Sequence, residues 1–287
     1  MRWILLVAAL AACDSNDSAT SDANVSTDGQ SSDASGSSAC GQAGAVTGVV
    51  NGMIIVGGVE RGYVRVVPAN YDSERAYPLI FAWHGRTGSG TLARQYFRIE
   101  QAAGDAAIIV YPHGLPVTAD PNDTGWELTA NGRDVALFDA LQAEISASYC
   151  VGRTYSMGHS FGGYMSNALG CFRGGTATGK VRAIASVAGG GPFGACSGDP
   201  ISAAIIHGMG DQVVAFTQGE ASRDAWRTDA GCETTSMPID PAPCVAYDGC
   251  DNGLVVRFCA HNETTGGGHG WPTFAAPTAW QLFRDSP

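Results

Sequence analysis

A serine placed between a predicted strand and a predicted helix is the residue of this sequence with the clearest chemical use. Gly158-x-Ser160-x-Gly162 has the spacing of a nucleophile elbow, in which flanking glycines remove the Cβ atoms that would clash across a tight turn. Because the chain contains 39 glycines, the bare pattern arises easily by chance, and its context must decide. The apolar run 153–157 predicts a buried strand and 164–172 predicts a helix. We therefore predict that Ser160 is a nucleophile exposed at the apex of this turn.

An acid and a base are required downstream, because a serine hydroxyl is a poor nucleophile unless a base takes its proton and a carboxylate orients that base. Hydrolases with this turn have the order serine, acid, histidine along the chain. Asp211 stands just beyond the apolar run 203–207, where a buried strand is expected to end. Although most aspartates after Gly-x-Gly only cap a turn, this position favours Asp211 as the acid. Asp240 and Asp251, both in a cysteine-rich segment, are the alternatives.

The candidate base is a histidine in a glycine-rich loop. After position 160 the only histidines are His207, His261 and His269. His207 abuts one predicted strand and His261 lies at the end of another, whereas His269 stands in Gly-Gly-Gly-His-Gly without bulky neighbours. We predict that Ser160, Asp211 and His269 form a catalytic triad in which the histidine activates the serine.

Two N–H donors must also face the oxyanion that forms during such a reaction. One is the backbone N–H of Phe161, directly after the nucleophile. The other is expected from the His-Gly loop after the apolar run 77–83, from the backbone of Arg86 or alternatively of Thr87. We expect His84 to hold this loop rather than to act as a second base.

The remaining pattern predicts the elements that position these residues. Segment 52–68 predicts a hairpin that turns near Gly57-Gly58. Continuous apolar runs separated by helical patterns then predict an α/β fold, in which a mostly parallel sheet is covered by helices on both faces. The strands are expected at 77–83, 106–111, 153–157, 181–188, 203–207 and 254–259, and the helices at 91–103, 134–149, 164–172 and 224–229.

A long loop, 114–131, follows one predicted strand and belongs to the ligand-binding edge of such a sheet. We expect a substrate pocket between the elbow and the loops 86–90, 114–131 and 266–271. Trp126, Trp271 and Thr87 are its predicted lining, with flat apolar surface for an aromatic acyl group. The alternative is that both tryptophans only pack the loops.

The N-terminus predicts export. Arg2 and the short apolar run 3–10 resemble a signal peptide over residues 1–12, because so few apolar residues cannot span a bilayer. Cys13 after Leu-Ala-Ala resembles a bacterial lipobox, which predicts lipidation of Cys13 and a location in the cell envelope or outside the cell; an ordinary cleavage site is the alternative. Residues 13–39 are rich in Ser and Asp and predict a disordered tether before a catalytic domain at 40–287.

Composition limits the partners. A chain of 287 residues with 45% hydrophobic content can bury one sizeable core, and a net charge of -11 argues against binding to nucleic acid. We expect no cofactor, no metal, a monomer, and membrane attachment only through Cys13. Eight further cysteines form an even set, which in an exported chain predicts disulfides rather than a zinc site. They are Cys40, Cys150, Cys171, Cys196, Cys232, Cys244, Cys250 and Cys259.

A set of short motifs along the chain points to one family. They are Cys40-Gly-Gln, Gly62–Tyr71, His84-Gly85, Gly125-Trp126, Gly132–Val135, Gly158–Gly162, His207–Asp211 and Gly267–Pro272. In these motifs the chain resembles the secreted feruloyl esterases of carbohydrate esterase family one, and the related extracellular polyhydroxybutyrate depolymerases have a similar layout. The resemblance implies an α/β-hydrolase fold, metal-free ester hydrolysis, and the roles given above to Ser160, Asp211 and His269. It also implies that Cys40 pairs with Cys150 and Cys171 with Cys196, with the other four cysteines around the His269 loop.

We therefore expect a serine carboxylesterase of the feruloyl esterase type that acts on polysaccharide-linked esters. A polyhydroxybutyrate depolymerase and an acetylxylan esterase are the nearest alternatives. A peptidase, an acyltransferase or a surface-binding module on an inactive hydrolase scaffold are more distant ones.

Overall fold

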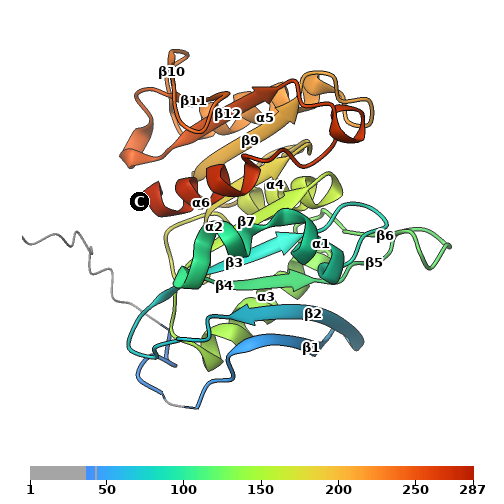
Figure 1. The fold of residues 1–287 in the computed structure, drawn as a ribbon, viewed down its shortest axis with the longest axis vertical. Helices are drawn as coiled ribbons and strands as arrows, with labels where there is room; N and C mark the ends of the chain where they lie inside the picture. Colours follow the sequence, from blue (N-terminus) through green and yellow to red (C-terminus); the bar gives the residue numbers. More distant parts are fainter. Residues whose placement is uncertain (1–36, 43) are drawn as a thin grey trace, which may run out of the picture. The chain divides into compact units, whose positions relative to one another are not determined.

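A ten-stranded sheet forms the centre of the computed structural model, which describes residues 37–42 and 44–287 (Figure 1). Its strands are β1 (Gly48–Val56), β2 (Val59–Val67), β3 (Tyr77–Trp83), β4 (Ile108–Pro112), β7 (Val151–His159), β8 (Val181–Val187), β9 (Ser202–Gly208), β10 (Ser236–Pro238), β11 (Cys244–Tyr247) and β12 (Val256–His261). They follow the order β1-β2-β4-β3-β7-β8-β9-β12-β11-β10. The strands from β4 to β12 in this order are parallel, and an antiparallel pair is added at each edge. The predicted mostly parallel sheet is confirmed.

The central strands are apolar throughout because both faces of the sheet are covered. In β3, Leu79, Phe81 and Trp83 belong to the hydrophobic core on one face. Ile80 and Ala82, which point the other way, belong to the core on the opposite face. A strand buried on both sides therefore reads as a continuous apolar run rather than an alternating one.

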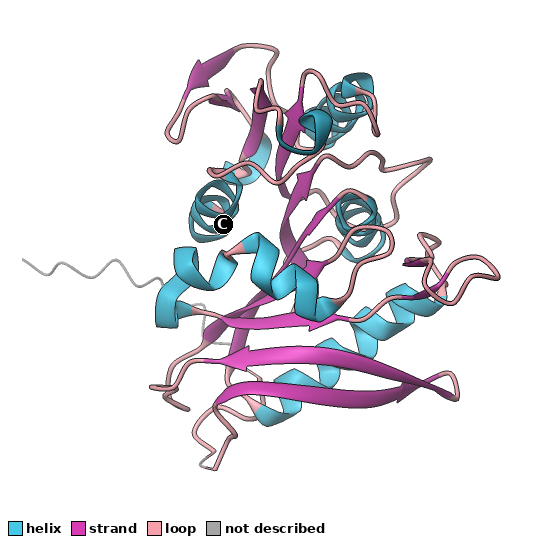
Figure 2. Cartoon of the chain, turned by 45° about the vertical axis from the view of Figure 1, so that its right-hand side comes forward, coloured by secondary structure: helices cyan, strands magenta, loops and turns pink. Residues whose placement is uncertain are grey.

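Helices cover both faces of the sheet, as Figure 2 shows. The helices are α1 (Gly90–Phe97), α2 (Ile99–Ala103), α3 (Arg133–Ser148), α4 (Phe161–Arg173), α5 (Phe216–Asp229) and α6 (Ala275–Asp285), with short 3-10 turns at Gly104–Ala106, Asp251–Gly253 and Thr265–Gly268. Side chains of α3, α4 and α5 pack into the first core, and those of α1, α2 and α6 into the second. A small antiparallel pair, β5 (Leu115–Pro116) and β6 (Thr124–Gly125), lies within the predicted loop 114–131.

Two predicted helices differ from the structure, and three elements were not predicted. The helix expected over 91–103 is broken into α1 and α2 at Arg98, whose φ of 54° ends the first helix in the left-handed region. Helix α5 begins at Phe216, about two turns before the predicted start at residue 224. The sequence interpretation also omitted α6, β10 and β11.

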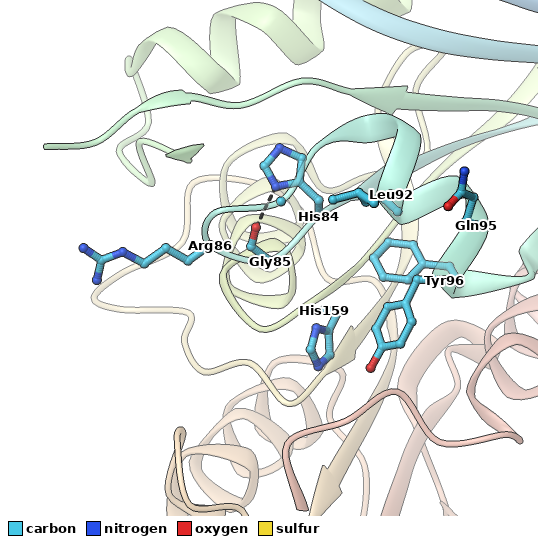
Figure 3. A pocket seen from close by; sticks show the side chains of 10 residues that line it. His84, Gly85, Arg86, Leu92, Gln95, Tyr96 and His159 are labelled. Carbon is cyan, nitrogen blue, oxygen red and sulfur yellow. Dashed lines mark hydrogen bonds between the residues drawn. The ribbon is translucent and has the colours of Figure 1, made fainter. Parts of the chain in front are cut away.

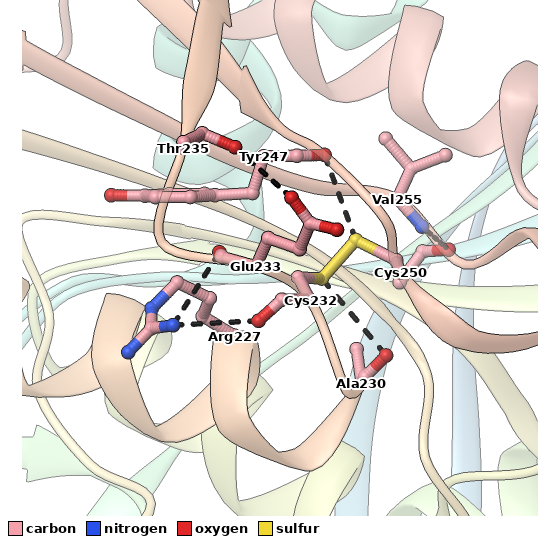
Figure 4. The surroundings of a disulfide bond; sticks show 9 residues. Arg227, Ala230, Cys232, Glu233, Thr235, Tyr247, Cys250 and Val255 are labelled. Carbon is pink, nitrogen blue, oxygen red and sulfur yellow. Dashed lines mark hydrogen bonds between the residues drawn. A yellow bond between two sulfur atoms is a disulfide. The ribbon is translucent and has the colours of Figure 1, made fainter.

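Four disulfides cross-link the fold. Cys40–Cys150 and Cys171–Cys196 are the two pairs that the family resemblance implied. The other cysteines pair as Cys232–Cys250 and Cys244–Cys259, on the segment from the end of α5 to β12. Figure 4 shows the Cys232–Cys250 bridge beside Arg227 of α5, which donates hydrogen bonds to the carbonyls of Cys232 and Glu233. Cys244–Cys259 joins β11 to β12, and Cys232–Cys250 joins the segment after α5 to the segment after β11. Both bridges precede the His269 loop in the chain.

The predicted signal peptide (1–12), the lipidation site Cys13 and all but the last residues of the tether (13–39) lie outside the described residues. Within residues 37–42 and 44–287, no helix is both long enough and apolar enough to cross a bilayer. In the same residues, His, Cys, Asp and Glu side chains form no cluster of three or more suited to a metal ion.

Candidate active site

The predicted nucleophile, Ser160, lies in a strained turn between β7 and α4. Its backbone has φ 54° and ψ -119°, a region that residues with a side chain rarely adopt. The flanking glycines are needed for space: a Cβ on Gly158 would lie 2.3 Å from the Gly162 carbonyl oxygen, and one on Gly162 would lie 1.8 Å from that of Trp83. The Ser160 N–H donates to the Val187 carbonyl of β8 at 2.8 Å. The turn is therefore held by the sheet on both sides, with Ser160 at its apex.

Asp211 and His269 come together at the ends of the neighbouring strands. Asp211 follows β9, and its Oδ2 lies 2.8 Å from Nδ1 of His269. The other oxygen, Oδ1, accepts the backbone N–H groups of Val213 and Val214, each at 2.8 Å. Burial acts to raise the pKa of Asp211, but the hydrogen bonds from His269 and these two amides together bring the pKa below its ordinary value. The carboxylate is therefore ionised and aimed at the imidazole.

The alternative acids and bases do not replace Asp211 and His269 in this pair, although Nε2 of His207 lies 3.4 Å from Oδ2 of Asp211. His207 is buried and its Nε2 lies 2.9 Å from the Val214 carbonyl, so that nitrogen must carry a proton. His261 is also buried, and its Nδ1 accepts the Glu263 N–H. Burial lowers the pKa of both histidines. Asp240 is exposed and lines a different surface depression, beside α6.

His159, the residue before Ser160, also contacts the His269 loop. Its Nε2 lies 2.6 Å from the carbonyl oxygen of His269, and the two rings are 5.0 Å apart. Because only an N–H can bond a carbonyl, Nε2 carries the proton. The sequence interpretation gave His159 no role, although its place inside the Gly-x-Ser-x-Gly pattern was a signal.

Two backbone amides are available beside Ser160. Within the described residues, the N–H groups of Phe161 and Arg86 have no hydrogen-bond acceptor in the protein. The Thr87 N–H, the alternative donor, is already bonded to the Thr124 carbonyl at 2.8 Å. The loop after β3 passes close to the nucleophile, because a Cβ on Gly85 would lie 3.3 Å from Cβ of Ser160. Arg86 is therefore better placed than Thr87 to be the second donor.

The loop that carries Arg86 is tied to the segment around β5 and β6. The Arg86 guanidinium donates to both oxygens of Asp123, at 2.5 and 2.6 Å. Hydrogen bonds from Arg86 and Thr118 lower the pKa of Asp123 to about 2. The Thr124 hydroxyl adds a hydrogen bond to the Gly88 carbonyl at 2.8 Å. The bidentate pair and the Thr87–Thr124 bond together fix the conformation of this loop.

His84 is structural, as the sequence suggested. Its Nδ1 lies 2.6 Å from the Gly85 carbonyl and its Nε2 accepts the Gly114 N–H at 2.9 Å. Burial lowers the pKa of His84 to about 4, so the ring is neutral and can accept this bond near pH 7. The residue joins the loop after β3 to the strand pair that follows β4.

A pocket of about 490 Å³ opens beside the elbow, between the loop after β3 and helix α1 (Figure 3). The close view shows Leu92, Tyr96 and His159 around it, with the Arg86 side chain extending away. Leu92 is 56% and Tyr96 44% exposed, which leaves apolar surface open to a ligand. These two α1 residues were missed from sequence because the helix gave no sign of which face borders the site.

The two predicted pocket tryptophans pack inside the protein instead. Trp126 is 2% exposed, its Nε1 donates to the His84 carbonyl at 2.8 Å, and its ring packs edge-on against Trp83. Trp271 is 9% exposed and stacks on Phe97 with ring centroids 4.4 Å apart. The expectation that Trp126 contacts the substrate was therefore wrong, and Trp271 borders the site only from behind α1. Thr87 is exposed on the loop after β3 but is not among the residues that line the pocket.

Comparison with known proteins identifies the class of this chain. Feruloyl esterase C from Emericella nidulans is 31% identical over 265 residues, which cover 85% of this chain and 89% of that protein. Feruloyl esterase D from Neurospora crassa is 30% identical over 257 residues, covering 79% and 83%. No family model matches the chain.

Solved structures share the fold at low sequence identity. An acetyl xylan esterase from Aspergillus awamori has a TM-score of 0.60 at 13% identity, covering 83% of this chain and all of that one. A ferulic acid esterase from Anaeromyces mucronatus, in complex with ferulic acid, has a TM-score of 0.51 at 16% identity, covering 86% and 94%. The fold is that of the α/β-hydrolases.

The fold and these relatives define a carboxylic ester hydrolase. Within that class, the chain belongs to the feruloyl esterase family.

Proposed function

We propose that the protein hydrolyses hydroxycinnamoyl esters attached to polysaccharide, through a triad of Ser160, Asp211 and His269. The observation that carries the proposal is the Asp211–His269 pair, 2.8 Å apart, on a chain whose relatives include feruloyl esterases. In this mechanism Ser160 Oγ attacks the ester carbonyl while Nε2 of His269 takes its proton. The Arg86 and Phe161 N–H groups stabilise the oxyanion.

Collapse of the tetrahedral intermediate breaks the bond to the sugar oxygen, which leaves with the proton from His269. Water then attacks the acyl-Ser160 ester, again giving its proton to His269, and the free acid is released. Asp211 stays ionised and stabilises the imidazolium in both steps. No metal or cofactor takes part in this scheme.

The pocket beside α1 supports an aromatic acyl group. Leu92 and Tyr96 provide exposed apolar and aromatic surface to its 490 Å³, and His159, the residue before Ser160, also lines it. We expect Tyr96→Ala to raise KM for methyl ferulate more than for p-nitrophenyl acetate, because an acetyl group does not reach this wall. Tyr96→Phe, which keeps the ring, is the matched control.

A substrate panel on the purified protein tests the proposal. Methyl ferulate and feruloylated arabinoxylan oligosaccharides should be cleaved. Ser160→Ala and His269→Ala should lower kcat on the order of 10⁶-fold and leave only a small residual rate, whereas His261→Gln should stay active. Cleavage of acetylated xylan or hydroxybutyrate oligomers without any action on hydroxycinnamates would assign the acetylxylan esterase or depolymerase activity instead. Wild-type rates in Ser160→Ala would refute the triad altogether.

We also propose that the enzyme is exported as a bacterial lipoprotein, anchored through Cys13. The support is the sequence Leu10-Ala-Ala-Cys13 before a polar segment. Cys13→Ser should release the protein from the membrane fraction with its specific activity unchanged. An intact mass that shows Cys13 unmodified in membranes would contradict the anchor.

A further inference from the structure

The loop that carries His269 has few side chains to hold it. Gly266, Gly267 and Gly268 all have positive φ, and together with Gly270 they give this segment little surface to pack. The hydrogen bond that Nδ1 of His269 donates to Asp211 fixes the orientation of the imidazole ring. It does not by itself fix the main chain from which the ring projects. The main chain on either side of His269 is held by the Gly270 N–H, which donates to the Thr265 carbonyl at 2.8 Å, and by the Trp271 N–H, which donates to the Tyr96 hydroxyl at 2.7 Å. An anchor on the His269 carbonyl itself adds to these bonds and bears directly on the distance between Nε2 and Ser160.

His159 provides such an anchor. Its Nε2 donates to the His269 carbonyl at 2.6 Å, so the last residue of β7 is hydrogen-bonded to the main chain of the proposed base. The His159 ring is itself held, since Tyr96 packs against it edge-on at 5.6 Å and Trp271 at 6.3 Å. Because His159 immediately precedes Ser160, the same strand end sets the positions of both the nucleophile and the base.

We propose that His159 is a positioning residue, which holds the main chain of His269 at the distance from Ser160 at which the imidazole reaches the serine hydroxyl. This inference rests on the proposed role of His269 as the base. His159 is not a second base, because its Nε2 proton is used by the carbonyl and no carboxylate is bonded to its ring in the described residues.

The protonation state of His159 agrees with this role. Burial lowers the pKa of His159 to about 4, so the ring donates its hydrogen bond without a charge near pH 7. A cation 5.0 Å from His269 would oppose the imidazolium that forms there during the reaction. A neutral N–H donor avoids this cost, whereas lysine or arginine at position 159 would not.

The test compares two amide variants that differ by one methylene. In His159→Gln the side-chain nitrogen can take the place of Nε2, and in His159→Asn it falls short of the His269 carbonyl. A displacement of about 1 Å in a reacting group can cost on the order of 10²-fold in rate. We expect His159→Gln to keep kcat for methyl ferulate within about fivefold of wild type, and His159→Asn to lose about 10- to 100-fold, with KM changed little in both. Equal losses in the two variants would overturn the proposal.

A double-mutant comparison separates positioning of the base from general damage. If His159 acts through His269, adding His159→Asn to His269→Ala should lower the residual rate no further. A further loss of the same factor would show that His159 acts on the pocket or the oxyanion donors, and would refute the inference. An active His269→Ala would instead refute the proposed triad, so the two failures are distinguishable. Melting temperatures of all four proteins show whether each variant is folded.

Discussion

Asp211→Asn should nearly abolish turnover, and the structure shows why. Two backbone amides, of Val213 and Val214, donate to Oδ1 of Asp211. In the variant the amide oxygen must take that place, because an NH2 group there would face two donors. The NH2 group then points at Nδ1 of His269, where the wild type has an acceptor at 2.8 Å. The imidazole must then accept this hydrogen bond at Nδ1 and carry its own proton on Nε2. In this tautomer Nε2 cannot take a proton from Ser160.

The magnitude follows from the loss of the correct tautomer and of the carboxylate charge. The equivalent change in a serine protease triad lowers kcat on the order of 10⁴-fold, which corresponds to about 5 kcal/mol. We expect a loss of about 10³- to 10⁴-fold in kcat for methyl ferulate, with KM within a few-fold. Asp240→Asn is the control, because this exposed carboxylate lies beside α6, and it should keep wild-type activity. Steady-state kinetics on folded protein give the answer; an active Asp211→Asn variant would move the acid role to another residue and refute the reasoning.

Three further predictions concern the surroundings of the site. Asp123→Asn should lower kcat about tenfold and change KM less, because loss of the bidentate pair frees the loop that presents the Arg86 amide. An unchanged kcat would show that the Arg86–Asp123 pair is not needed to hold this loop. In the unfolded protein His84 takes up a proton near its ordinary pKa of 6.5, whereas in the folded protein its pKa is lowered to about 4. The folded protein therefore loses about 3 kcal/mol of stability from this group as the pH falls from 6.5 to 4. Thermal melts between pH 7 and 4 should accordingly show a weaker pH dependence in His84→Gln. Thiol titration of the unfolded, unreduced domain that begins after Cys13 should find almost no free cysteine, and reduction should lower its melting temperature.

The sequence predicted the structure best at positions where the catalytic chemistry and the local backbone conformation require the same residue types. The turn at Ser160 could be predicted because its glycines are required by contacts of 2.3 Å or less, which no side chain can satisfy. The fold class followed because strands such as β3 must be apolar on both faces. Neither inference needs knowledge of which distant residues meet.

Helix boundaries were harder to predict. Nothing in the residues 91–103 marks Arg98 as left-handed. The two helices that meet there have different neighbours, since α1 packs against β3 and β4 and α2 against α6. Helix α6 had a signal that the interpretation overlooked: Ala275, Ala279, Leu282 and Phe283 recur at helical spacing and are all buried. Pro277 is no obstacle there, since proline is tolerated in the first turn.

The tryptophans show where local reasoning about the site fails. Trp126 lies in the segment around β5 and β6, and the sequence could not show that its ring points inward, toward Trp83, rather than toward the substrate. This segment contributes to the site through polar groups: the Arg86–Asp123 ion pair and the Thr87–Thr124 hydrogen bond hold the loop after β3. Such pairs join positions far apart along the chain, and no spacing rule identifies them.

In the proposed mechanism, the parts that serve catalysis are separate from the part that would face the acyl group. The segment around β5 and β6 holds the loop that carries Arg86 from outside the pocket, whereas Leu92 and Tyr96 of α1 border the pocket directly. We expect substitutions at Asp123 to change turnover similarly for every ester. Substitutions at Leu92 should instead change the ratio of kcat/KM between ferulate and acetate esters, because only the bulky acyl group reaches that wall. Specificity in this enzyme is then a property of one exposed helix face, which can vary while the loops that hold the reacting atoms stay unchanged.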